Sequence, residues 1–110
     1  MNVKQMASQL GLEEDDIYSV LELFIQTAPS DLISMMAAFD RQDMTQVGTA
    51  AHSLKGSTGT LGFMDISGLA QLIMQQSREN NIEALTRTVS SFQKQMKALL
   101  SELEEVLKNR

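Results

Sequence analysis

Hydrophobic residues recur every three or four positions along most of this 110-residue chain, which is the spacing of amphipathic α-helices. The most regular run alternates steps of three and four through Ile82, Leu85, Val89, Phe92, Met96, Leu99, Leu103 and Val106. This repeat of about 3.5 residues predicts a long helix that packs along its whole length at a shallow angle.

A second run of apolar residues covers residues 17–39 and keeps its helical phase through Pro29. The four acidic residues at 13–16 suit the positive end of a helix dipole and mark the start of this element. A proline inside a helix removes one backbone hydrogen bond and bends the axis. The segment therefore predicts either one long helix kinked near residues 27–29 or two nearly coaxial helices.

Two further segments flank these runs. Residues 3–10 predict a short helix that ends at Gly11, and at this length it needs a larger body to pack against. Residues 44–61 predict a helix that begins after Asp43, a favourable capping residue, and ends at Gly62.

The segment after Gly62 predicts the fourth of the longer helices. Asp65 is a candidate cap for it, and its apolar face consists of Ile66, Leu69, Ala70 and Ile73. Asn80 and Asn81 then favour a turn before the last helix.

The pattern as a whole predicts one all-α domain over residues 1–110. Four helices joined by short turns favour an up-and-down antiparallel four-helix bundle, with the short N-terminal helix as a lid at one end. The repeat in residues 82–106 would also suit a coiled-coil dimer, but the other helices need a partner face, so we expect a monomeric bundle. Four methionines are expected to fill its core: Met35, Met36, Met74 and Met96.

The segment 44–61 carries the single histidine of the chain on a face of its own. The apolar stripe of this helix consists of Val47, Ala51, Leu54, Thr58 and Leu61. A second set lies within about 100° of arc away from that stripe: Gly48, His52, Lys55, Gly56 and Gly59. Each interior glycine costs about 0.8–1.0 kcal/mol relative to alanine. The face therefore either packs closely against another helix or admits a partner near His52, and the charge of Lys55 favours the partner.

Residues 51–57, Ala-His-Ser-Leu-Lys-Gly-Ser, followed by Leu61-Gly62, resemble the motif of histidine-containing phosphotransfer (HPt) domains. A weaker similarity extends over most of the chain, through Leu21 and Phe24, Asp43, and Leu69. One position departs from the pattern, because Met74 stands where such domains often carry Glu or Gln. A second polar contact to the histidine or its neighbours is therefore either absent or supplied by Gln71 or Gln75.

The resemblance implies a phosphorelay module of two-component signal transduction. His52 would accept a phosphoryl group from an aspartate of one response-regulator receiver domain and pass it to another receiver. A histidine is partly neutral at pH 7, so the lone pair of its outward Nε2 can attack phosphorus. Lys55 would stabilise the phosphoryl group, and a partner would dock on Gly48, Gly56 and Gly59. The receiver, in a hybrid sensor kinase or a response regulator, would supply the catalytic aspartate and its Mg²⁺.

Composition excludes several other classes of function. A net charge of −5 argues against nucleic-acid binding, and no apolar run approaches the length of a membrane span. One histidine and no cysteine cannot build a closed metal site, and we expect no cofactor bound by this chain. The chain has no nucleotide-binding loop, so a phosphocarrier without autonomous kinase activity is expected rather than an enzyme. The absence of a signal-like start favours a cytoplasmic location.

An alternative from a different class remains open at this point. A non-catalytic helical adaptor could bind a partner through the glycine-rich face without being phosphorylated. Neither the donor, the acceptor nor the direction of phosphoryl flow is encoded in these motifs. The absence of a linker-like tail leans towards a free-standing carrier rather than a fragment of a hybrid kinase.

Overall fold

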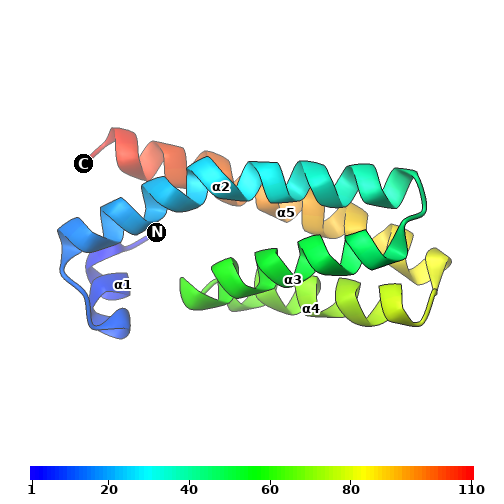
Figure 1. Ribbon diagram of the computed structural model, residues 1–110. Coiled ribbons are helices and arrows are strands. Elements are labelled where there is room, and N and C mark those ends of the chain that lie inside the picture. The colour runs from blue at the N-terminus through cyan, green and yellow to red at the C-terminus, as the bar shows by residue number, and fades with distance from the viewer.

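The computed structural model describes all of residues 1–110 and consists of five α-helices without strands. These are α1 (Val3–Leu10), α2 (Glu14–Asp40), α3 (Met44–Thr60), α4 (Met64–Arg78) and α5 (Ile82–Lys108). Figure 1 shows α2, α3, α4 and α5 running up and down as an elongated antiparallel bundle, with α1 folded against one end. The predicted four-helix bundle with an extra N-terminal helix is confirmed. No helix has the length and apolar character needed to cross a membrane.

Helix α2 is continuous from Glu14 to Asp40 and contains Pro29. Of the two predicted alternatives, one long helix is therefore correct and two separate pieces are wrong. Its buried residues stay three or four apart on both sides of the proline: Ile17, Leu21, Phe24, Ala28, Leu32, Met35 and Ala38. Because the packing face is uninterrupted, tertiary contacts hold the helix together where one backbone hydrogen bond is lost.

The helix ends largely follow the predicted signals. The Asp43 carboxylate accepts a hydrogen bond from the Gln46 backbone N–H at 3.1 Å and caps α3. Gly11 and Gly62 end their helices in the left-handed region, with φ of 69° and 84°, where a side chain would be strained. Asn81 caps α5, with its Oδ1 3.3 Å from the Ala84 nitrogen.

The expectation that Asp65 caps α4 is wrong. The cap position is Phe63, which makes no side-chain capping bond, and Asp65 lies inside the first turn of the helix. There its carboxylate still faces the positive end of the helix dipole. The Phe63 ring lies 6.0 Å from the Phe24 ring, so packing on α2 fixes where α4 begins.

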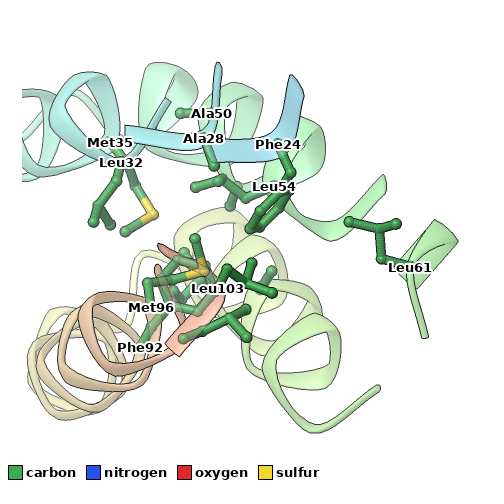
Figure 2. Packing of buried hydrophobic residues seen from close by; sticks show 14 of the residues in the cluster. Phe24, Ala28, Leu32, Met35, Ala50, Leu54, Leu61, Phe92, Met96 and Leu103 are labelled. Atoms are coloured by element: carbon green, nitrogen blue, oxygen red, sulfur yellow. The ribbon is translucent and has the colours of Figure 1, made fainter. Parts of the chain in front are cut away.

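A single cluster of 22 buried hydrophobic residues forms the core, with members on all five helices. In Figure 2, Met35 and Leu54 point from α2 and α3 towards Met96 and Leu103 of α5. The long apolar repeat of α5 is therefore satisfied within one chain, as the bundle interpretation requires. Met35 and Met96 are fully buried, whereas Met36 and Met74 are half-buried at the edge of the core.

Helix α1 packs on α2 at one end of the bundle, where it buries Val3 and Ala7. The same end is held by contacts of both chain termini. The Met1 ammonium lies 3.3 Å from Glu102 of α5, and the Arg110 guanidinium contacts Glu22 of α2 at 2.8 Å. The remaining surface, including the outer wall of α3, is left uncovered by α1 (Figure 1).

Candidate functional site

His52 stands near the middle of α3 on the outer wall of the bundle. Its neighbours Ala51 and Leu54 are completely buried, so α3 is anchored to the core on its inner side. His52 itself is exposed and its imidazole has no hydrogen bond or ion pair. The predicted outward orientation of the histidine is therefore confirmed.

Lys55 lies three residues after His52, on the side of α3 that faces α4. Its side chain is half-buried and has no carboxylate partner. Its backbone carbonyl accepts a hydrogen bond from the Ser67 hydroxyl of α4 at 3.2 Å. Because residues three apart on a helix are neighbours, the Lys55 ammonium can approach a group carried by His52.

The three glycines of the predicted docking face have different surroundings. A Cβ built on Gly48 or on Gly56 would meet no atom within 4 Å, so both positions are open. A Cβ on Gly59 would lie 3.1 Å from the Ser67 hydroxyl oxygen. The expectation that Gly59 leaves room for an external partner is thus corrected, because α4 already occupies that space. The close helix packing considered from the sequence applies at Gly59 alone.

Neither Gln71 nor Gln75 of α4 makes a hydrogen bond to His52, which agrees with the alternative that the second polar contact is absent. The pair Gly59–Ser67 sets the antiparallel register, which places Met74 level with His52 and Gln71 level with Lys55. Gln71 is half-buried and Gln75 is exposed, and neither amide is hydrogen-bonded to His52 or Lys55. A role for either glutamine near the histidine stays a prediction.

A link on the other flank of His52 was missed by the sequence analysis. The Ser53 hydroxyl donates a hydrogen bond to the Asp31 carboxylate at 2.9 Å and joins α3 to α2 next to the histidine. The two residues are 22 positions apart and both reach the surface, so no local pattern pairs them. The bond fixes the α2–α3 groove at the level of His52.

An apolar hollow lies beside Gly56 on the same flank. It has a volume of about 250 Å³ and is lined partly by Val20, Leu23 and Phe24 of α2. Leu23 is 59% exposed, an unusually open position for a leucine. Because Gly56 has no side chain, this apolar surface continues unobstructed onto the wall that carries His52.

The site therefore combines an exposed imidazole, a cation within one helical turn and an open, partly apolar wall. Such an arrangement can carry a covalently attached anion and present it to a second macromolecule. No group of three or more histidine, cysteine or acidic side chains is placed to hold a metal ion.

Comparisons with known proteins bear on the family and the fold of the chain. A family model described as the Hpt domain matches residues 19–108. The chain is 27% identical over 95 residues to histidine-containing phosphotransfer protein 2 of Arabidopsis thaliana, and the match covers 84% of this chain but only 61% of that protein. The crystal structure of histidine-containing phosphotransfer protein B from Pseudomonas aeruginosa PAO1 is similar, with a TM-score of 0.85 over 100% of this chain and 96% of that one. At 17% identity, this last similarity supports the fold alone.

Proposed function

Because the chain belongs to the Hpt domain family, we propose that it acts as a phosphocarrier between receiver domains, with His52 as the phosphorylated residue. The observation that carries the assignment to His52 is its exposure on the outer wall of α3, with Lys55 one turn away and open glycine positions beside it. The chain would act as a monomer, since its apolar helix faces are used inside its own bundle.

In the first step, the lone pair of the neutral His52 Nε2 attacks the phosphorus of a receiver's aspartyl phosphate. The N–P bond forms as the P–O bond to the aspartate breaks, and the carboxylate leaves with the electron pair. The ring keeps its proton on Nδ1 and becomes cationic. In the second step, a carboxylate of another receiver attacks phosphorus, the N–P bond breaks and the neutral imidazole is restored.

The charge that develops during this transfer needs more than one cation. Phosphoryl transfer depends on positioning and on electrostatic stabilisation, commonly by Mg²⁺. We assign the Mg²⁺ and the reacting aspartate to the receiver. Lys55 would supply the positive charge of this chain, and the protein would have no kinase activity of its own.

The receiver would approach along the open wall at Gly48 and Gly56, with Leu23 and the apolar hollow beside Gly56 as part of the contact. We leave Gly59 out of this surface because the Ser67 side chain of α4 lies against it. An exposed apolar patch next to a reactive group is typical of a site for a transient protein partner.

The test is phosphotransfer from a purified receiver labelled at its aspartate. The wild-type chain should take up label that is lost in acid, as a phosphoramidate is. His52→Gln should keep the fold, because exposed substitutions change the free energy of unfolding by about 0.5 kcal/mol or less. The same variant should take up no label.

Two results would contradict the proposal. Label on the His52→Gln protein would place the phosphoryl group elsewhere. Receiver binding without label on the folded wild-type protein would favour the adaptor alternative, in which the α3 wall only docks a partner.

A further inference from the structure

The surface around His52 is almost free of charge. Residues 23–39 of α2 and all of α3 contain, apart from the histidine, only two ionisable side chains, Asp31 and Lys55. Lys55 lies on the side of His52 that faces α4, whereas Asp31 lies on the opposite flank, across the groove between α2 and α3. The proposed transfer uses Lys55 and leaves Asp31 without a role.

The Asp31 carboxylate is held in place by the residue next to His52. Its Oδ2 accepts the 2.9 Å hydrogen bond from the Ser53 hydroxyl, and its other oxygen has no hydrogen bond. Arg41 lines the same hollow of about 470 Å³, but its guanidinium lies beside Asp43, at 3.7 Å. No other cationic group pairs with Asp31 either. Because a carboxylate has about four acceptor sites, Asp31 presents a fixed and incompletely satisfied anion at the surface.

Neither the fold nor the phosphoryl group explains this charge. An asparagine would accept the same hydrogen bond from Ser53 through its amide oxygen, so joining α2 to α3 needs no carboxylate. An anion also repels a phosphoryl dianion and cannot stabilise it. Asp31 does, however, border the surface over which a receiver would approach, since it lies one turn after Thr27, which lines the apolar hollow beside Gly56. The charge is therefore placed to meet the partner.

We propose that Asp31 is a specificity-determining residue, which selects receivers that carry a lysine or an arginine opposite it. This inference rests on the proposed function of His52. A receiver that docks over α2 and α3 removes water from Asp31, and a carboxylate left there without a partner weakens binding. A cation on the receiver compensates for that loss, whereas a neutral or acidic residue does not, so the residue discriminates between receivers. Because Ser53 already holds the carboxylate, little side-chain freedom is lost when the ion pair forms.

The first experiment measures phosphotransfer from the labelled receiver that phosphorylates the wild-type chain fastest, at receiver concentrations where the rate is proportional to concentration. Asp31→Asn keeps the size of the side chain and the acceptor for Ser53 but removes the charge. The second-order rate constant should fall by about two- to fivefold at low salt, the size of an exposed ion pair. The difference from wild type should shrink in about 1 M salt. Asp40→Asn removes an exposed carboxylate without an ion pair from the end of α2 and is the matched control, which should transfer like wild type.

Phosphoramidate, which transfers a phosphoryl group to imidazole without a protein donor, separates an effect on the receiver from an effect on His52. Its rate of reaction with His52 should not be lower in Asp31→Asn than in wild type. A residue that only positions α3 or the imidazole would lower this rate together with the rate of transfer from the receiver.

Charge reversal identifies the cation on the receiver. Asp31→Lys should slow transfer more than Asp31→Asn does, because two cations then face each other. Each surface lysine and arginine of the receiver is next changed to glutamate, one at a time. One of these receiver variants should transfer faster to Asp31→Lys than to the wild-type chain, which reverses the preference of the unchanged receiver.

The possible failures are distinguishable. If no receiver and no phosphoramidate labels His52 in the folded wild-type protein, the proposed function and this inference both fall. If the wild-type chain is labelled but Asp31→Asn transfers like Asp40→Asn at low salt, Asp31 does not meet the receiver while the role of His52 stands. A matching fall in the phosphoramidate rate, or the absence of any receiver variant that prefers Asp31→Lys, would also overturn the assignment of Asp31.

Discussion

Alanine at each of the three glycines of α3 should separate the two roles that a glycine can have on this helix. Alanine is better than glycine inside a helix by about 0.8–1.0 kcal/mol. At Gly48 and Gly56 the added Cβ meets no atom within 4 Å, so the full gain should appear as a higher free energy of unfolding. At this chain length each kcal/mol corresponds to about 4 °C in melting temperature.

Gly59→Ala should behave differently because of Ser67. The new Cβ would lie 3.1 Å from the Ser67 hydroxyl oxygen, which must move and weaken its 3.2 Å bond to the Lys55 carbonyl. A hydrogen bond of this kind contributes about 0.5–1.5 kcal/mol. This loss offsets the gain in helix propensity. The free energy of unfolding of Gly59→Ala should therefore be close to the wild-type value and about 0.5–1.5 kcal/mol lower than that of Gly56→Ala.

Urea unfolding at a fixed temperature measures these differences in the free energy of unfolding. The dependence of that free energy on urea concentration must have the same slope for all variants, so that the differences report stability alone. Ser67→Ala provides the internal control, because it removes the oxygen and leaves only the Ser67 Cβ, 3.9 Å from the new methyl group. In that background Gly59→Ala should recover the gain seen at Gly56. The reasoning fails if Gly59→Ala stabilises the wild-type protein as much as Gly56→Ala does, or if Gly56→Ala destabilises it.

Two further predictions concern transfer. Lys55→Ala should slow phosphotransfer several-fold without abolishing it, since an exposed charge interaction is worth about 0.2–1 kcal/mol. High salt should reduce the difference in transfer rate between this variant and wild type. Equal transfer rates of the two proteins at low salt would remove Lys55 from the mechanism. Gly56→Gln should have a higher melting temperature than wild type, because glutamine is a better helix former than glycine. Its phosphotransfer should be slower, by up to about a hundredfold if the receiver is held off by about 1 Å. A higher melting temperature with a normal transfer rate would mean that the receiver does not approach over Gly56.

Much of the fold follows from the spacing of apolar residues alone. The stripes in residues 17–39 and 82–106 predicted most of the buried side chains, because a helix repeats its faces whatever it packs against. The exceptions lie at the stripe ends, where Ile82 is exposed and Phe39 and Val106 are half-buried. The outward position of His52 followed in the same way. Pro29 could not be interpreted fully from the sequence, because its effect on the helix depends on how firmly both halves are packed.

The glycine face shows where such reasoning stops. A helical repeat gives the angle of each side chain around its own axis but does not give the angle at which the neighbouring helices sit. Gly56 and Gly59 belong to one face of α3, yet only Gly59 falls under α4. Contacts between residues distant in sequence, such as Ser53 with Asp31, are hidden for the same reason. The start of α4 also depends on a distant contact, because Phe63 packs on Phe24.

The placement of the two chain ends has a consequence for how this bundle can be joined to other domains. Met1, Asn2 and Asn109 line one hollow at the end of the bundle that α1 closes, so both ends emerge together (Figure 1). A domain attached there by a flexible segment would leave the long wall of α3 unobstructed. Tethering could then raise the local concentration of an attached receiver to the millimolar range without altering the surface it meets. The same bundle could thus serve relays within one polypeptide and relays between separate ones.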